Sequence, residues 1–78
     1  MNQTINGLRD GYWERYYPDG TLAYKGNYIL DKEEGYWEEY WTNGQIRHKG
    51  NYKNGNRDGY WEWYNLYGQL MGKQYYIR

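Results

Sequence analysis

The 78-residue chain has no cysteine, and it also lacks phenylalanine, valine and serine. Without cysteine, the chain cannot form a disulfide framework or a thiolate metal site, and the redox compartment stays open. Without cysteine or serine, it also lacks the usual nucleophiles that pair with histidine in covalent catalysis. A fold built from this sequence therefore needs another source of core contacts and offers no familiar reaction centre.

Net charge and long apolar runs are absent as well. The 10 basic and 10 acidic residues cancel and are spread along the chain, unlike the basic footprint of a nucleic-acid-binding protein. No apolar run is long enough to cross a bilayer, and no polybasic patch would favour a membrane surface. Residues 1–4 lack the charged and apolar regions of a secretion signal. We therefore expect a cytoplasmic protein without a nucleic-acid partner, and membrane association is disfavoured.

Tyrosine and tryptophan are abundant, making up 23% of the residues although 26% are charged. A disordered chain would be poor in aromatic residues. Aromatic side chains with a polar tip can cover a sheet and still meet water. The composition therefore predicts a folded domain in which Tyr and Trp replace a large aliphatic core.

An internal repeat organises the sequence. The stretch Gly35–Tyr52 reappears as Gly11–Tyr28 and as Gly59–Tyr76, at a spacing of 24 residues and without an insertion. Periods of 20–50 residues are typical of stacked supersecondary units. We interpret the chain as a single domain with one partial repeat and three further repeats, at residues 1–10, 11–34, 35–58 and 59–78.

Each repeat reads as a β-hairpin. Aromatic runs bounded by glycine-containing turns predict antiparallel strands, and a Gly in the fourth place of each tetrad fits a type I turn with a left-handed bulge. The turn at 28–31 has Asp31 where Gly is expected, so we expect it to be the least regular. The predicted fold is an all-β, single-layer twisted antiparallel meander of three β-hairpin repeats. Its six strands are expected near 11–17, 20–28, 34–41, 44–52, 58–65 and 68–77.

The loop length sets a testable register. Three-residue loops throughout would place Tyr16 opposite Leu22 and Gly50 beneath Tyr36. A two-residue loop at Asn54-Gly55 would exchange the two faces between repeats, and the constant period disfavours it. The same register predicts three Trp–Lys pairs: Trp13–Lys25, Trp37–Lys49 and Trp61–Lys73.

The repeat resembles a known family. Tyr24-Lys25-Gly26-Asn27-Tyr28, followed by Gly35, is similar to the MORN repeat pattern Tyr-x-Gly-x-aromatic-x-x-Gly. The second copy has His48 in place of the first Tyr, and the third departs further, with Gly72 and Gln74 in place of Tyr and Gly. The Gly-Tyr-Trp-Glu-x-Tyr-x-x-x-Gly element resembles the bacterial variant of this repeat. The resemblance extends over residues 6–76.

The resemblance implies hairpins laid side by side in an elongated, gutter-like sheet. It also implies a non-catalytic scaffold or binding role, since MORN proteins are associated with protein partners, with self-association and, by name, with membranes. Many bacterial relatives of the variant are catalogued as candidate antitoxins. A bacterial or phage origin and an inhibitory, antitoxin-like role are therefore expectations drawn from the family.

No group of residues predicts catalysis, a cofactor or a metal ion. Glu14, Glu38 and Glu62 stand at one phase of the repeat and so share one environment, whereas a catalytic acid and base need different environments. We expect these carboxylates to be solvated or bonded to Tyr. His48 is the only histidine, which excludes a site with several His ligands.

Aromatic residues that the repeat does not require are the best binding candidates. Trp63 stands where the other repeats have Arg15 and Glu39, so this position is expected to face solvent. Trp and Arg are enriched in interface hot spots, and Arg47 would lie across from Trp61. The competing interpretation is that Trp63 covers Met71 as local core. The candidate partner-binding residues are Trp63, Trp41, Trp61, Arg47 and Trp37.

Three functions remain open. The leading hypothesis is a protein–protein interaction module, with possible homo-oligomers through unpaired strand edges. An alternative is a carbohydrate- or choline-binding aromatic hairpin module, although the second Trp-Tyr-Tyr element and the secretion signal expected of such repeats are missing. The third is association with a membrane surface.

Overall fold

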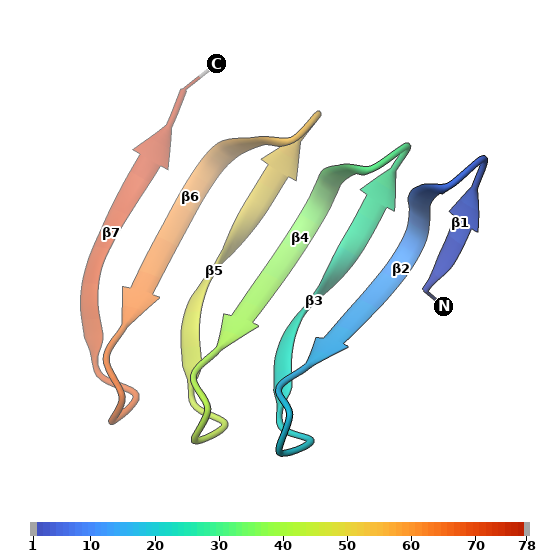
Figure 1. The fold of residues 1–78 in the computed structure, drawn as a ribbon. Helices are drawn as coiled ribbons and strands as arrows, with labels where there is room; N and C mark the ends of the chain where they lie inside the picture. Colours follow the sequence, from blue (N-terminus) through green and yellow to red (C-terminus); the bar gives the residue numbers. More distant parts are fainter. Residues whose placement is uncertain (1, 78) are drawn as a thin grey trace.

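The computed structural model describes residues 2–77, which form seven strands paired in chain order in one open antiparallel sheet (Figure 1). The all-β single-layer meander is thereby confirmed, and the Cα trace spans 40 × 36 × 12 Å. Within the described range, no helix is long and apolar enough to cross a membrane. The strands are β1 (Gln3–Ile5), β2 (Leu8–Tyr16), β3 (Leu22–Ile29), β4 (Lys32–Tyr40), β5 (Ile46–Lys53), β6 (Asn56–Tyr64) and β7 (Leu70–Tyr76).

The prediction of six strands missed β1. Residues 3–5 of the partial repeat pair with β2 through a register that runs from Gln3 opposite Asp10 to Ile5 opposite Leu8. The Asn6-Gly7 turn that joins the two strands has the same sequence as Asn54-Gly55. The partial repeat therefore adds an edge strand.

The connections at one end of the sheet have the predicted form. After β2, the Gly20 N–H donates to the Tyr17 carbonyl (2.9 Å) and the Tyr17 N–H donates to the Thr21 carbonyl (2.8 Å). This is a three-residue loop that Gly20 closes in the left-handed region, at a φ of 91°. The loops after β4 and β6 have the same hydrogen bonds, and all three project from one end of the sheet (Figure 1).

The connections at the opposite end are shorter, which corrects the predicted three-residue loop at Asn54-Gly55. Lys53 pairs directly with Asn56, and Ile29 pairs directly with Lys32, so each turn has two central residues. Both central residues have positive φ, as a type I′ turn requires. The Leu30-Asp31 turn shares this form, so the expected irregularity is absent.

The predicted register holds next to each long loop and then fails. Tyr16 lies opposite Leu22 as predicted, but Arg15 lies opposite Tyr24, because Ala23 is an extra residue on β3. Arg47 and Met71 are the equivalent extra residues on β5 and β7. Such bulges shift a register by one position. The predicted Trp–Lys pairs were therefore wrong, and each Lys instead faces a repeated Glu in the pairs Glu14–Lys25, Glu38–Lys49 and Glu62–Lys73.

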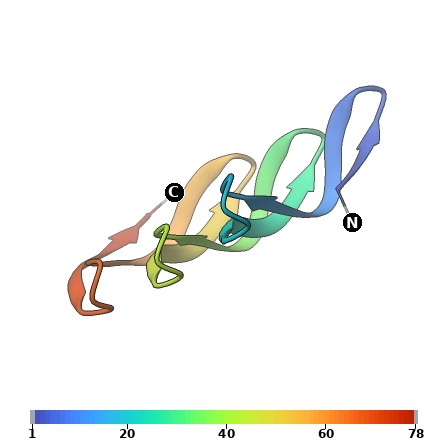
Figure 2. The ribbon, with the colours of Figure 1, turned by 60° about the horizontal axis from the view of Figure 1, so that its bottom comes forward.

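A second irregularity follows each short turn and adds two residues to one strand. Lys25 pairs with Glu38 and Asn27 pairs with Glu34, so β4 has two more residues than β3 in this interval. The extra pair includes Gly35, which has a φ of 79°. An even number of added residues preserves side-chain alternation, so this irregularity does not exchange the faces. The one-residue bulges next to the long loops offset the exchange that the two-residue turns would otherwise cause. Bulges also bend strands, and Figure 2 shows the strands curving along their length.

The core lies on one face, where tryptophan rings cover glycines. A Cβ atom at Gly26 would overlap the Trp37 ring, and one at Gly50 would overlap the Trp61 ring. The prediction that Tyr36 covers Gly50 was therefore wrong. Trp61 is fully buried, and Trp37 and Tyr28 are each 4% exposed. We call this surface the Trp face.

The opposite surface, the Tyr–Glu face, contains the repeated carboxylates. Glu38 accepts hydrogen bonds from Tyr36 (2.8 Å) and Tyr40, and Lys25 Nζ lies 3.4 Å from its Oε1. Burial of Glu38 opposes its ionisation, but the bonds from the two tyrosines outweigh burial and lower its pKa. Burial and the bond to Glu38 raise the pKa of Tyr36 to about 12. The predicted structural role of these carboxylates is confirmed by these bonds.

Candidate functional site

The Trp face is organised as a continuous row of Trp and Tyr rings. Tyr28 meets Trp37 edge to face at a centroid distance of 4.9 Å, and Tyr52 meets Trp61 in the same way at 4.9 Å. Trp37 also contacts Tyr52, at 5.9 Å, which joins the two repeats. Edge-to-face aromatic pairs contribute about 0.5–1.5 kcal/mol each beyond buried area, so the row stabilises neighbouring repeats against one another.

The indole N–H groups fix this row. Trp37 Nε1 donates to the Asn27 carbonyl (3.0 Å), and Trp61 Nε1 donates to the Asn51 carbonyl (2.9 Å). A buried indole N–H would be costly without such a partner. Each Trp is thus held by a glycine beneath its ring and a carbonyl on the preceding strand.

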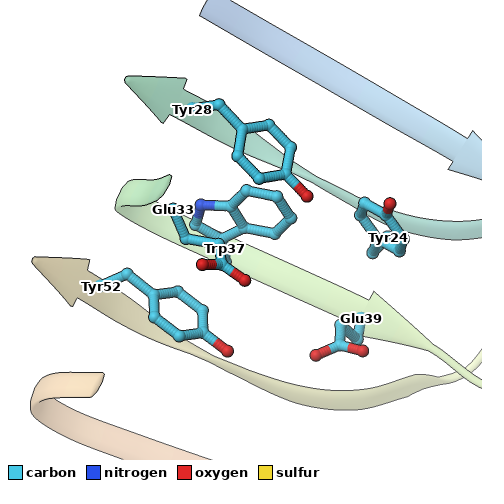
Figure 3. Close-up of a pocket in the computed structure, with 6 residues that line it drawn as sticks. All are labelled: Tyr24, Tyr28, Glu33, Trp37, Glu39 and Tyr52. Atoms are coloured by element: carbon cyan, nitrogen blue, oxygen red, sulfur yellow. The ribbon is translucent and has the colours of Figure 1, made fainter. Parts of the chain in front are cut away.

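A cavity of about 190 Å³ opens on the Trp face between three strands. We call it the middle pocket. Figure 3 shows Tyr28 and Tyr52 on either side of Trp37, with their hydroxyl ends directed toward Tyr24 and Glu39. The pocket is lined by Tyr24 and Tyr28 from β3, by Glu33, Trp37 and Glu39 from β4, and by Tyr52 from β5.

The middle pocket combines neutral hydroxyls with two carboxylates. A hydrogen bond from His48 lowers the pKa of Glu39, against the opposing effect of burial. Burial raises the pKa values of Tyr28 and Tyr52, so both phenols stay protonated at neutral pH. His48 uses Oε2 of Glu39, and a carboxylate has acceptor capacity at both oxygens. The pocket is therefore suited to a group that carries several N–H donors and a positive charge.

Arginine side chains lie over the neighbouring rings of the Trp face. The Arg9 Cζ atom is 4.2 Å from the Tyr28 ring centroid, and Arg9 Nη1 donates to the Tyr28 hydroxyl (2.8 Å). The Arg57 Cζ atom is 4.9 Å from the Trp61 centroid, and Arg57 Nη1 donates to the Tyr76 hydroxyl (3.2 Å). The face therefore holds guanidinium groups both on its rings and on its phenol oxygens.

The structure places Trp37 and Trp61 in the core, so they present almost no surface in the free chain. Trp63 is only partly buried, packed against Trp61 (6.3 Å) and Tyr76 (6.4 Å). It pairs with Gly72, while the bulged Met71 is 67% exposed. Trp63 is therefore neither a cover for Met71 nor a freely solvated side chain.

Trp41 and Arg47 form a separate pair near the long loops. The Arg47 Cζ atom is 4.7 Å from the Trp41 ring centroid, which corrects the expected stacking of Arg47 on Trp61. Trp41 Nε1 donates to the Tyr64 carbonyl (3.1 Å), just as the Tyr17 hydroxyl donates to the Tyr40 carbonyl (2.5 Å). Trp41 therefore joins two repeats. Between residues 2 and 77, no ring or cation–π contact links it to Trp61 or Trp63.

The binding role predicted for these five residues stays a prediction. Sequence reasoning missed the middle pocket, although one signal was available. Glu33 stands at the repeat position that Arg9 and Arg57 occupy. We therefore count the structural repeats from this position, as residues 9–28, 33–52 and 57–76, and in this count the middle repeat reverses the charge found in its two outer neighbours. Across residues 2–77, no cluster of three or more His, Cys, Asp or Glu side chains could hold a metal ion.

Comparison with known proteins identifies the family. No curated protein and no solved structure shows significant similarity to the chain. A family model described as the MORN repeat variant matches residues 9–29 and 33–54. These two ranges together cover more than half of the 78 residues, and the matched segments contain part of the Trp face, including Gly26, Trp37 and Tyr52. The chain belongs to the MORN repeat variant family.

Proposed function

We propose that this chain is a non-catalytic module that binds a protein partner through its Trp face. Membership of the MORN repeat variant family supports a repeat module of the interaction type. The observation that carries the proposal is the middle pocket, where aromatic rings and two carboxylates meet on an open sheet face. An open face with one small cavity suits a protein surface better than a drug-sized ligand, whose pockets usually enclose about 300–1,000 Å³.

The partner that this face fits is a protein segment with basic and aromatic side chains. Glu33 and Glu39 offer negative charge, and Trp63, which packs against Trp61, offers an aromatic surface on the same face of the sheet. Charge complementarity of this kind steers encounter and fixes orientation. An inhibitory, antitoxin-like role in a bacterial or phage cytoplasm is one form that such binding would take.

Site-directed photo-crosslinking in the native host tests the proposal. A photoreactive amino acid at position 63 lies on the Trp face, and the same group at position 12 lies on the Tyr–Glu face as a matched control. A protein captured from position 63 but not from position 12 would then be purified and its affinity measured directly. Capture that is equal from both positions would contradict a role for the Trp face.

The deciding measurement is the affinity of the purified partner for Trp63→Arg. The first repeat has Arg15 at this position, so the repeat tolerates arginine there. We expect the fold to persist and the dissociation constant to rise by about 30-fold, since a central aromatic contact is worth about 2 kcal/mol. Unchanged affinity would move the binding site elsewhere. A chain that binds glycans or lipid vesicles in place of a protein would overturn the proposal.

A further inference from the structure

We propose that the middle pocket binds the guanidinium group of an arginine side chain presented by the partner. The inference deepens the proposed function and rests on it. It comes from a comparison between repeats: the outer repeats fill this part of the Trp face with their own arginine, and the middle repeat does not.

The outer repeats show which group binds at the position equivalent to the middle pocket. Arg9 and Arg57 stand at the same position of the repeat, 48 residues apart, and each donates from Nη1 to the hydroxyl of the Tyr that follows 19 residues later. Arg57 also lies over three rings, at 4.9 Å from the centroid of Trp61, 5.5 Å from that of Trp63 and 5.8 Å from that of Tyr76. A guanidinium stacked on rings and bonded to a phenol is thus an arrangement that this fold already makes twice.

The middle repeat retains the rings and replaces the cation. Tyr28, Trp37 and Tyr52 repeat the pattern of Tyr52, Trp61 and Tyr76, but Glu33 stands where Arg57 stands. In the described part of the chain, no arginine or lysine makes a cation–π contact with Trp37. The space that Arg57 occupies in its own repeat corresponds here to the open cavity of about 190 Å³.

Glu39, the second carboxylate of the middle pocket, also replaces a residue that the third repeat uses to bind its arginine. Glu39 stands at the repeat position of Trp63, so the middle repeat has two acids where the third repeat has an arginine and a tryptophan. In the third repeat the chain supplies the cation, and in the middle repeat it supplies the counter-charge. Around the pocket, His48 uses Oε2 of Glu39, the charges of Arg47 and Arg57 also act on Glu39, and Arg9 donates to the Tyr28 hydroxyl. The carboxylate of Glu33 and Oε1 of Glu39 are the acceptors left to an incoming cation.

The chemistry favours guanidinium over other cations. Its flat face stacks on aromatic rings, and its five N–H donors match carboxylates and phenol oxygens. A quaternary ammonium group would meet the rings but has no N–H donor for Glu33 or Glu39. A lysine ammonium is compact and strongly hydrated, so it would stack less well. The cavity is also below the usual size for a drug-sized ligand and suits a single side chain.

An NMR titration of the full chain tests this inference with a defined probe. N-acetyl-arginine-N-methylamide is added while the Trp37 indole N–H and the Tyr52 amide are followed. We expect saturable shifts at these two signals. The citrulline analogue, which has the same shape without the charge, should bind at least about 10-fold more weakly, as expected for loss of a charge-assisted bond. The lysine analogue and tetramethylammonium should also bind more weakly than the arginine probe.

Three substitutions test the location of the site. Glu33→Arg gives the middle repeat the arginine of its neighbours, so we expect it to fill the pocket from within and to lower probe affinity at least about 10-fold. Glu14→Arg makes the same change of charge on the Tyr–Glu face and should leave the affinity within about twofold at 150 mM salt. Glu33→Gln, which keeps the shape of the side chain, should weaken binding by an intermediate amount.

The inference is overturned if the citrulline analogue binds as well as the arginine probe, if tetramethylammonium binds more tightly, or if folded Glu33→Arg binds like the wild type. Should Glu33→Arg fail to fold, the affinities of Glu33→Gln and of the probe series still test the guanidinium site. A negative titration together with partner binding that depends on Trp63 would refute only the guanidinium site. Saturable arginine binding without any crosslinked protein would support the site and refute the proposed protein partner.

Discussion

At the scale of single residues, the pairing of glycine with tryptophan determines the packing. Trp37 and Trp61 are buried because Gly26 and Gly50 leave room for an indole directly on the backbone of the neighbouring strand. An aromatic side chain over a cross-strand glycine restores contacts that glycine lacks. The absence of a side chain is thus what creates the core at these positions.

Replacing Gly50 should test this pairing. A valine at this position would overlap the Trp61 ring, so we expect Gly50→Val to lower the free energy of unfolding by at least about 2 kcal/mol, as overpacking does. Asn51→Val is the matched control, because Asn51 is exposed and contributes only its carbonyl to Trp61. Urea unfolding followed by Trp fluorescence measures both. Equal losses would show that the Trp61 ring does not lie on Gly50.

The Glu39–His48 pair should make the stability of the fold depend on pH in the acid range. The bond from His48 lowers the folded-state pKa of Glu39, so folding is favoured above the unfolded-state pKa of a Glu, about 4.3, and this contribution is lost as pH falls toward the folded-state pKa. Other carboxylates with lowered pKa values act in the same direction. We therefore expect the melting temperature of Glu39→Gln to fall less than that of the wild type between about pH 5 and about pH 3, the range in which a Glu with a lowered pKa takes up its proton. Identical slopes would contradict the coupling.

At the scale of elements, the three-residue loops and the two-residue turns affect strand pairing differently. Each three-residue loop is followed by a one-residue bulge that shifts the register of the strand pair. At each two-residue turn, the two strands are paired right up to the turn. The Asp31 N–H donates to the Arg9 carbonyl (2.7 Å), and the Gly55 N–H donates to the Glu33 carbonyl (3.0 Å). The turns therefore also hold the segment of each repeat that contains Arg9 or Glu33.

A substitution in the Leu30-Asp31 turn should increase the stability of the fold. Leu30 has a φ of 47° and is 53% exposed, so it bears the cost of the left-handed region without contributing much to the core. Leu30→Asn should raise the free energy of unfolding by about 0.5–1 kcal/mol, because Asn tolerates this conformation better. Leu66→Asn is the control, since Leu66 is similarly exposed, at 47%, and is not among the residues with positive φ. No difference between the two variants would argue against strain at Leu30.

At the scale of the whole molecule, the sheet is open and has two edges. The short β1 forms one edge and β7 forms the other (Figure 1). Gln74 on β7 stands at the repeat position of Gly26 and Gly50, so an indole could not lie on this strand as it does on β3 and β5. Pairing at the β7 edge would therefore use the backbone and leave the row of Trp rings interrupted.

Self-association through β7 is our proposal for this edge. Tyr75 is 66% exposed and Ile77 is 88% exposed. The stretch Tyr75-Tyr76-Ile77 carries no charge, and an edge segment of this kind invites pairing with another copy. We expect sedimentation at high micromolar concentration to show a dimer or a weak higher oligomer. Ile77→Lys should reduce it, whereas Ile29→Lys, at an exposed residue away from this edge, should not. A monomer at all concentrations would contradict the proposal.

The sequence by itself determined the period, the all-β meander, the long loops closed by Gly20 and its equivalents, and the structural role of the repeated Glu residues. These features are local: turn chemistry and strand propensity act within a few residues. The tertiary structure alone decided the register, because bulges at Ala23, Arg47 and Met71 have no sequence signature of their own. That shift of one residue moved Trp in place of Tyr onto the glycines. It also brought Glu33, Trp37 and Tyr52 together, since the middle pocket depends on which residues of three separate strands face each other.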